Sequence, residues 1–451
     1  SVTPTLSYNG NAAFSGAHIG ASIAGTTAQG SAALGITRPT AAPAPGPGAP
    51  SHVQTWYYYG LTDANMSVPV SYMVSHADFV EDDGFTAQHA EAFKDAGGRY
   101  AVSYTDPAYT PACVAPFSAP AGACSGPIGN LVNADESAWF HSANGSRVNR
   151  YDSYNGKYQE ALNPASAAAR NAYASATAAI VAAAPKLDFF FADDSGGTWT
   201  GPDGTTMSGW FYGFNAPAVE IASDAAFVPA EESMLAAAAR PVIINGSDPG
   251  TLLPSYNGAF LGAQNVSGDN WEGCLSDGSG VAGTRNGRWV EQSNGLLMTT
   301  AHKSLALCMM YAAATPANRI YELASWWMTY DPTYSVASPQ TPAADGTTIF
   351  PEYDLVPRQP LATATAAVGE LSPAANVYVR EFGACYQAGT AIGPCAAIVN
   401  IGSSSVAVPA LRGHYSAALS VDAASAYAGG KATWTGPVPT QLAALSAVVL
   451  R

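Results

Sequence analysis

Residues 187–200 read LDFFFADDSGGTWT, and this stretch decides the fold. The run from 187 to 192 is almost wholly apolar, as is typical of a strand buried on both faces of a parallel sheet. Two adjacent acids, Asp193 and Asp194, follow it directly. Side chains alternate along a strand, so Phe189, Phe191 and Asp193 are predicted to share one face. The stretch therefore predicts a buried parallel strand that carries carboxylates at its end.

A second interpretation treats Ser195 as a nucleophile, because DSGG (194–197) resembles the signature of chymotrypsin-like serine proteases and TTAHK (299–303) resembles their histidine signature. In that family the histidine precedes the serine, whereas His302 follows Ser195 here. Position 193, where the signature has glycine, is aspartate. Those proteases consist of two β-barrels, which the alanine-rich helix predicted at 163–186 contradicts. The carboxylate interpretation is therefore favoured.

Alternating strands and helices surround this stretch. We predict strands at 52–60, 77–84 and 99–107, a helix at 86–98, and a helix at 163–186 with a proline at its first position. Helix-then-strand pairs continue with strands within 241–250 and 258–274, and with a helix at 302–315 before an aromatic strand at 318–331. About eight such units predict an α/β fold, a (β/α)₈ TIM barrel.

The two ends of the chain differ from this central region. Residues 1–50 are rich in small residues and end in RPTAAPAPGPGAP (38–50), which predicts an arm and a proline-rich linker. After residue 361 the helical patterns stop, and strands are predicted at 375–387, 395–411, 414–422 and 445–451. We therefore predict an arm at 1–50, a barrel at 51–361 and a small antiparallel β-sandwich at 362–451.

The charge balance limits the class of partner. The net charge of −15 and a pI near 4.7 argue against binding to nucleic acid or to an anionic membrane surface. No run approaches the ~18 apolar residues of a membrane span. The chain begins at Ser1 without the features of a signal peptide, so we expect a mature secreted or periplasmic form with a neutral partner.

Six cysteines fall into three local pairs, Cys113/Cys124, Cys274/Cys308 and Cys385/Cys395. Such pairs predict disulfides and an oxidising compartment. The cysteines lack CxxC spacing and the seven histidines are scattered, so neither a metal site nor a cofactor is expected.

The carboxylates at strand ends indicate hydrolysis of glycosidic bonds, which uses two carboxyl groups on opposite sides of the scissile bond. Asp193 is the predicted inward group, and Asp194 orients a neighbour or begins the next loop. GDNWEGC (268–274) supplies Glu272 as the predicted general acid/base, because the adjacent Trp271 would desolvate it. Asp269 in the same segment and Asp248 after the preceding strand are the other candidates.

Several segments together resemble the hypothetical glycosyl hydrolase family 15 type. They are ESAWFHSANGSRV (136–148), LDFFFADD (187–194), NRIYELASWWM (318–328), FPEYDL (350–355), VYVREF (377–382) and AAIVNIGSSSV (396–406). The resemblance covers about residues 51–451. It implies a TIM barrel with a C-terminal β-sandwich, distantly similar to α-galactosidase and α-polygalactosaminidase barrels.

In related barrels the fourth-strand aspartate is the nucleophile and a sixth-strand acid is the proton donor, which by matching position implies these roles for Asp193 and Glu272. FFFADD departs from the usual glycine-containing strand start, and WEGC matches no motif of these barrels.

We therefore expect a glycoside hydrolase that acts on a polysaccharide or oligosaccharide, by a retaining mechanism and without a cofactor. Residues near strand ends are the candidates for sugar contact: Tyr57, Tyr104, Trp199 and Trp271 for stacking, and Asp106 and Asn245 for hydrogen bonds to hydroxyl groups. Two alternatives remain open: a carbohydrate-binding barrel without catalysis, and another hydrolase such as an esterase or a metal-dependent deacetylase.

Overall fold

The structure is a computed structural model of the 451-residue chain. It describes residues 17–22, 29–34, 51–58, 70–82, 88–111, 127–141, 144–152, 157–195, 198–200, 206–208, 224–247, 252–253, 261, 263–272, 274–275, 289–311, 315–340, 350–422 and 430–451.

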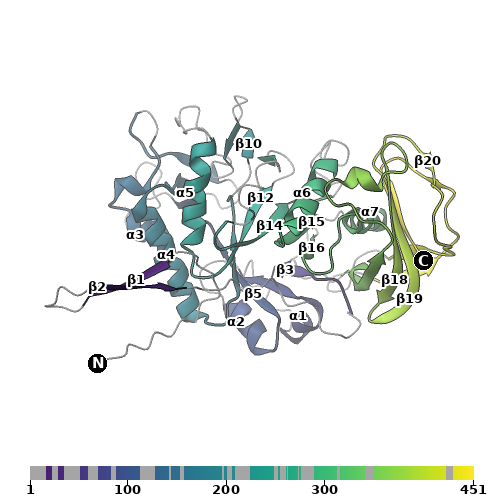
Figure 1. The fold of residues 1–451 in the computed structure, drawn as a ribbon, viewed down its shortest axis with the longest axis horizontal. Coiled ribbons are helices and arrows are strands. Elements are labelled where there is room, and N and C mark those ends of the chain that lie inside the picture. The colour runs from purple at the N-terminus through teal and green to yellow at the C-terminus, as the bar shows by residue number, and fades with distance from the viewer. Residues whose placement is uncertain are drawn as a thin grey trace.

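Eight parallel strands form the centre of the molecule (Figure 1). In chain order they are β3 (Trp56–Tyr58), β4 (Phe79–Asp82), β5 (Tyr100–Thr105), β9 (Phe189–Ala192), β12 (Val242–Ser247), β14 (Val266–Glu272), β15 (Leu305–Tyr311) and β16 (Ser335–Gln340). Each pairs in parallel with the next. A parallel bridge between Thr55 and Ala337 joins the first strand to the last, with the Ala337 amide donating to the Gln54 carbonyl at 2.9 Å. The predicted TIM barrel is confirmed.

The two faces of β9 have different surroundings, as alternation predicts. Phe189 and Phe191 pack inside the barrel with residues such as Trp56 and Ile243 of other strands. Phe190 and Ala192 pack outward in a cluster with helical residues that lie around the sheet. Because both faces of β9 are buried, nearly every residue of this strand is apolar.

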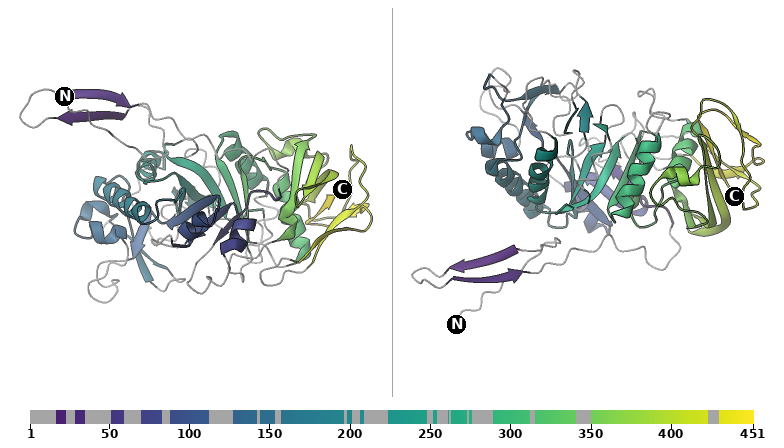
Figure 2. Two further views of the ribbon diagram at one scale, coloured as in Figure 1. Left: turned by 90° about the horizontal axis from the view of Figure 1, so that it is seen from below. Right: turned by 45° about the horizontal axis from the view of Figure 1, so that its top comes forward.

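Helices follow most of the strands and cover the outside of the barrel (Figure 2). They are α1 (Val70–His76), α2 (Gln88–Asp95), α4 (Ala167–Ala183), α5 (Asp224–Ala236), α6 (Trp289–Ala301) and α7 (Pro316–Trp327). The prediction that proline begins the helix before β9 is wrong. Ser166 is the N-cap of α4, and its side chain accepts a hydrogen bond from the Ala168 amide. A serine oxygen satisfies a free amide of the first turn, which the preceding Pro164 cannot do.

The assignment of the last helix and strand pair is reversed in the structure. Residues 305–311 form β15, whose residues Leu305, Leu307 and Met309 fill the barrel interior. The aromatic segment that follows belongs to α7, which begins after the N-cap Thr315 with a proline in its first turn. An apolar run of this length fits a buried strand or a buried helix, so its pattern alone misled the prediction.

The C-terminal region is an antiparallel β-sandwich at one flank of the barrel (Figure 1). Its larger sheet has the order β17 (Leu355–Pro360), β18 (Val377–Gln387), β19 (Thr390–Asn400), β24 (Ser446–Leu450), β21 (Ala418–Val421) and β22 (Ala432–Thr435). A second pair consists of β20 (Val406–Ala407) and β23 (Gln441–Leu442). β17, which precedes residue 362, is the edge strand of the larger sheet.

One hydrophobic core joins this region to the barrel. Trp289 of α6 and Trp327 of α7 share a cluster with sandwich residues such as Tyr378 and Phe382. The buried Arg380 of β18 donates to the carbonyl oxygens of Trp327, Met328 and Tyr330, where α7 ends. Carbonyl groups at the C-terminal end of a helix lack the α-helical partner, so the guanidinium caps this end of α7.

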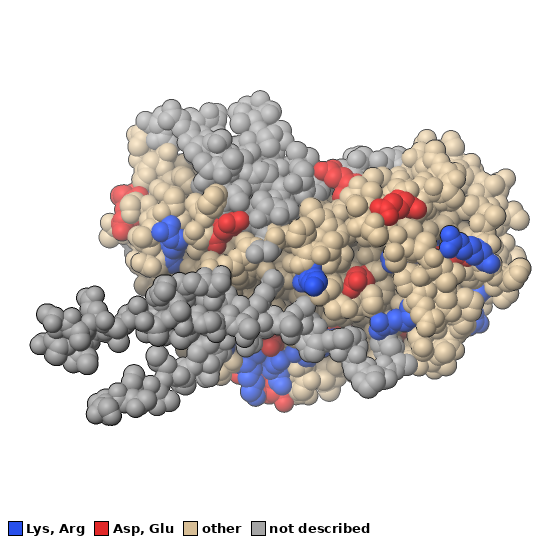
Figure 3. Space-filling view, in the orientation of Figure 1, with Lys and Arg blue, Asp and Glu red and all other residues tan. Residues whose placement is uncertain are grey.

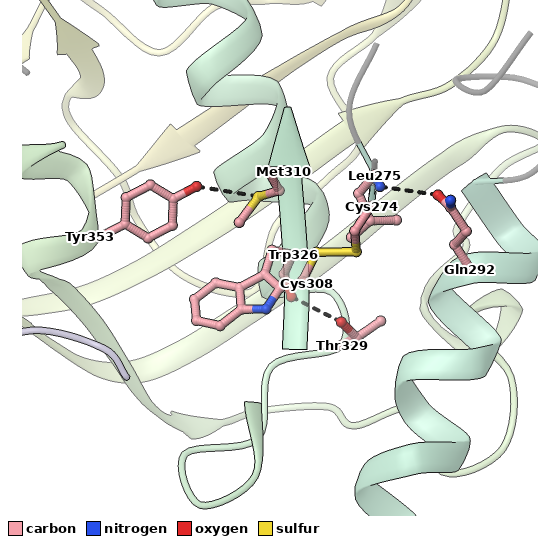
Figure 4. Close-up of a disulfide and its surroundings, with 8 residues drawn as sticks. All are labelled: Cys274, Leu275, Gln292, Cys308, Met310, Trp326, Thr329 and Tyr353. Atoms are coloured by element: carbon pink, nitrogen blue, oxygen red, sulfur yellow. Dashed lines mark hydrogen bonds between the residues drawn. A yellow bond between two sulfur atoms is a disulfide. The ribbon is translucent and has the colours of Figure 1, made fainter. Parts of the chain in front are cut away.

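Two of the three predicted disulfides are present, Cys274–Cys308 and Cys385–Cys395. Cys113 and Cys124 lie outside the described residues. Figure 4 shows the first bridge, which joins the segment after β14 to the middle of β15. Beside it the Leu275 amide donates to the Gln292 side chain of α6 at 3.0 Å. The bridge therefore lies between two barrel strands and the helix layer.

The chain before the barrel contains the hairpin β1 (Ala17–Ser22) and β2 (Gln29–Leu34). In both views of Figure 2 this hairpin lies outside the barrel. The rest of the predicted arm and linker lies outside the described residues. Among the residues that the structure describes, no helix is long and apolar enough to span a membrane.

A close contact between α6 and β14 gives a first testable prediction. A Cβ atom at Gly295 of α6 would overlap the six-membered ring of Trp271. Gly295→Ala is expected to destabilise the protein by about 1–3 kcal/mol, because the added methyl group would overlap a fully buried indole ring and force it to shift. Urea unfolding followed by tryptophan fluorescence measures this change. Gly369→Ala is the matched control, since nothing lies within 4 Å of its added Cβ; equal stability of the two variants would contradict the prediction.

Candidate active site

Polar side chains replace apolar ones at the carboxyl ends of four neighbouring strands. Tyr104 of β5, Asp193 after β9, Asn245 of β12 and Asn270 of β14 each lie two residues beyond an inward position, and they contact one another in a chain. The interior beneath them is apolar. Active sites of TIM barrels assemble at this end of the strands. The carboxyl-end cluster, defined by these four residues, is therefore the candidate site.

Asp193 is the centre of the cluster and is partly exposed. Its Oδ1 accepts hydrogen bonds from the Asn245 side chain at 2.7 Å and from the Asp194 amide at 2.9 Å. Its Oδ2 accepts one from the Tyr104 hydroxyl at 2.6 Å. Three donors fix the plane of the carboxyl group.

The donors to Asp193 are themselves held in one orientation. The buried Asn270 donates to the carbonyl oxygen of the Asn245 side chain at 2.8 Å, so the Asn245 NH₂ group must face Asp193. Burial and the charge of Asp193 raise the pKa of Tyr104 well above its ordinary value. The hydroxyl of Tyr104 therefore keeps its proton and remains a donor.

Asp194 has a different environment from Asp193. Its φ is +47°, in the left-handed region, and this turn directs its amide to the Asp193 carboxylate. Its own Oδ2 accepts a hydrogen bond from Arg150 Nη2 at 2.8 Å. Burial and the charge of Asp193 raise the pKa of Asp194 to about 7, although Arg150 acts in the opposite direction.

Arg150 comes from a three-stranded insert between β5 and α4. The insert has the order β6 (Tyr109–Pro111), β8 (Lys157–Ala161) and β7 (Asn149–Asp152). The guanidinium lies over the ring of Tyr109 at 3.8 Å and donates to the Gln159 side chain at 2.7 Å. Both contacts hold the Arg150 guanidinium beside Asp194, so the insert contributes a cation to the site.

Asp106 follows β5 and completes a group of three acids. Its Oδ1 accepts hydrogen bonds from the Ala108 and Tyr109 amides at 3.0 and 3.3 Å. Its Oδ2 is buried and has no hydrogen-bond partner. Burial, followed by the charges of Asp194 and Asp193, raises the pKa of Asp106 well above its ordinary range.

The structure thus brings together five of the residues that the sequence indicated: Tyr104, Asp106, Asp193, Asp194 and Asn245. Glu272 is the last residue of β14, and Trp199 belongs to the strand β10 (Thr198–Thr200), but the side chains of both lie outside the described residues. The sugar contacts expected of Tyr104, Asp106, Asn245 and Trp199 stay predictions. The catalytic roles expected of Asp193, Asp194 and Glu272 also stay predictions.

Two predicted stacking residues are not available for that role. Tyr57 is 1% exposed and packs with Met73 and Phe93 in the helix layer. Trp271 is 0% exposed and lies against Gly295 of α6. Both rings therefore point out of the barrel rather than into its mouth. The prediction that Tyr57 and Trp271 stack on a sugar is wrong, because both rings are buried under the helices.

The other candidates can also be placed. Asp269 is fully buried, and Asp248 lies outside the described residues. Ser195 is fully buried and its hydroxyl donates to the Ala192 carbonyl at 2.6 Å, whereas His302 is exposed in the turn that follows α6. Ser195 is therefore not arranged as a nucleophile. Within the described part of the chain, no group of three or more His, Cys, Asp or Glu could hold a metal ion.

Sequence reasoning missed Arg150 and Asn270. Asn270 could have been found, because it lies two residues before Glu272 and so shares its strand parity. Arg150 lies in a long connection with no periodic pattern, and its contact with Asp194 joins residues 44 positions apart.

Charges on the molecular surface are sparse. On the described part of the face shown in Figure 3, lysine and arginine side chains are scattered among acidic ones and do not merge into a basic patch.

No protein-family model matches the chain, and no curated protein sequence matches it. Solved structures with a similar course of the chain include an α-galactosidase from Thermus thermophilus (12% identity, 64% of this chain and 58% of that chain, TM-score 0.37). Others are the α-glucosyl transfer enzyme XgtA (11%, 89% and 98%, 0.46) and a xylosidase from Aspergillus niger (12%, 90% and 65%, 0.43). The chain thus spans little more than half of the Thermus protein.

Proposed function

We propose that the protein is a glycoside hydrolase that cleaves a neutral polysaccharide or oligosaccharide, with Asp193 as the nucleophile. The observation that carries the proposal is the Asp193 carboxylate, which is partly exposed at the barrel mouth and oriented by Tyr104, Asn245 and the Asp194 amide. A carboxylate fixed in this way is prepared to attack an anomeric carbon without further reorganisation.

The hydrogen-bond pattern supports a choice between the two oxygens of Asp193. Oδ1 accepts two hydrogen bonds, whereas Oδ2 accepts one. Oδ2 therefore keeps a lone pair for bond formation, and we assign it the attack. The bond from the anomeric carbon to the leaving oxygen breaks as the bond to Oδ2 forms, which gives a covalent glycosyl-enzyme.

A retaining mechanism also needs a second carboxyl group, which donates a proton to the leaving oxygen in the first step and acts as a base in the second. We propose Glu272 for this role, at the end of β14 and two residues beyond Asn270. It gives a proton to the leaving oxygen and then takes one from the water that releases the sugar. Tyr104, Asp106, Trp199 and Asn245 remain the proposed sugar contacts.

We also propose that the protein works outside the cytoplasm, in a secreted or periplasmic form. The two disulfides support this, because such bonds form and persist in oxidising surroundings.

The test is a panel of neutral polysaccharides, aryl glycosides and aryl esters, read by release of reducing ends or of the aryl group, with NMR to identify the first anomer formed. We expect cleavage of at least one glycoside with retention, and no effect of Ser195→Ala on that cleavage. Ester cleavage that Ser195→Ala abolishes would instead support an esterase. Retention of the protein by a polysaccharide gel without any cleavage would support a carbohydrate-binding barrel.

A further inference from the structure

Asp106 is a carboxyl group of which one oxygen is satisfied and the other is not. The backbone amides of Ala108 and Tyr109 donate to Oδ1, so Oδ2 is the oxygen on which a proton could lie. Oδ2 is buried and has no hydrogen-bond partner, although the Tyr109 hydroxyl interacts with the Asp106 carboxyl group and acts to lower its pKa. A buried carboxylate oxygen without a donor is costly, whereas a protonated one carries its own donor.

The charges around Asp106 favour the same state. Asp193 and Asp194 face it from the end of β9, and Arg150 faces it from β7. The hydroxyls of Tyr104, Tyr109 and Tyr173 come from β5, β6 and α4. The guanidinium of Arg150 is hydrogen-bonded to Asp194 rather than to Asp106. Three ionised acids against one cation would leave a charge of −2 in a largely buried site.

We infer that Asp106 holds a proton at neutral pH, so that it adds no negative charge to the group of acids around Arg150. Burial and the two neighbouring carboxylates, which raise the pKa of Asp106, act in this direction. Asp194 is the less suitable holder of the proton, because it has a cation in direct contact.

The inference deepens the proposed function. The protonation of Asp106 stands without that function, whereas the role of Asp106 in catalysis rests on it. A single negative charge on Asp193 is what a nucleophile facing an oxocarbenium-like transition state requires. Asp106 is then a positioning residue: it stays neutral beside the nucleophile and adds no second charge that would compete for the donors of Asp193.

The first test needs no substrate. In protein labelled with ¹³C at the aspartate carboxyl carbons, a protonated carboxyl signal is expected at about pH 7 that Asp106→Asn removes and Asp188→Asn leaves. Asp188 is the matched control, because it lies just before β9 at the opposite end of the barrel and pairs with Lys94 at 2.9 Å. A wild-type spectrum in which every assigned aspartate is ionised at that pH would overturn the inference.

Stability as a function of pH is the second test, and it separates Asp106 from Asp194. A carboxyl group with a raised pKa stabilises the folded state at low pH, and this contribution is lost as the pH rises through the folded pKa. The Asp106→Asn variant cannot ionise at this position and does not lose this stability. Its free energy of unfolding relative to wild type is therefore expected to increase from about pH 5 to about pH 9. Asp194→Asn removes the partner of Arg150 and is expected to be less stable than wild type throughout.

The opposite result for Asp106→Asn, a stability that falls relative to wild type as the pH rises, would mean that the ionised carboxylate is the stabilising form and would overturn the inference. Both tests read the protein alone, so a failure of the proposed function in the substrate panel leaves their outcome unaffected.

Discussion

Asp193→Asn is expected to lower kcat on the cleaved glycoside by on the order of 10⁶-fold, the scale on which loss of a catalytic nucleophile or its base reduces the activity of a hydrolase. The lone pair of the amide nitrogen is delocalised into the carbonyl group, so the neutral amide is a poor nucleophile toward the anomeric carbon and the covalent intermediate does not form at a useful rate. The measurement compares initial rates of wild type and variant on the same substrate.

The loss should come without loss of fold. An amide at position 193 keeps an oxygen for the Asn245 side chain and the Asp194 amide, and its NH₂ group can donate to the Tyr104 hydroxyl, which also accepts. Every hydrogen bond of the cluster therefore has a counterpart in the variant. We expect its stability to stay within about 1 kcal/mol of wild type.

Asp188→Asn provides the control, since it changes an aspartate at the other end of the same strand and should leave the rate within about twofold. If Asp193→Asn retained most of the activity, the nucleophile would have to be another group, and Asp194 would be tested next by the same substitution.

Much of the site was predictable because it lies in regular structure. The alternation of Phe189, Phe191 and Asp193 fixed which acid faces the barrel, and the structure agrees for both faces of β9. Tyr104 and Asn245 followed from the same rule that parallel strands bring their carboxyl ends to one rim.

Other residues were not predictable from pattern. Strands buried on both faces give no polar residue to show which side chains point inward, so Tyr57 and Trp271 were placed at the mouth although they pack under helices. Arg150 reaches Asp194 from an insert whose position relative to β9 depends on tertiary packing. The sequence carries no periodic signal for such a contact.

A second large effect is expected far from the site, at Arg319 of α7. Arg319 is 1% exposed and its guanidinium forms a two-pronged contact with Glu352, which is 0% exposed, at 2.7 and 2.5 Å. Its third contact, at 2.7 Å, is with the Asp422 carbonyl of the β-sandwich. One side chain therefore links the helix layer, the turn before β17 and the C-terminal region.

Arg319→Met is expected to destabilise the protein by roughly 3–5 kcal/mol at pH 8, because it leaves the Glu352 carboxylate buried without its cation. Burial raises the pKa of Glu352 even in the presence of Arg319, and without the guanidinium the pKa rises further. A raised pKa means that stability is lost as the pH increases, so the deficit of the variant should be smaller at about pH 5 than at pH 8. Urea unfolding at the two pH values measures both quantities.

The double variant Arg319→Met/Glu352→Gln distinguishes two contributions to the loss of stability. One is the loss of the ion pair, and the other is the buried Glu352 carboxylate left without a cation. Neutral side chains of similar size at both positions remove the uncompensated carboxylate, so part of the stability at pH 8 should return and the pH dependence should disappear. Lys186→Met is the matched control: Lys186 pairs with Asp95 at the exposed surface, where water screens the charges and little change is expected. A deficit in Arg319→Met that is equal at both pH values would show that lost packing and the contact with the Asp422 carbonyl, rather than the buried charge of Glu352, account for the role of Arg319.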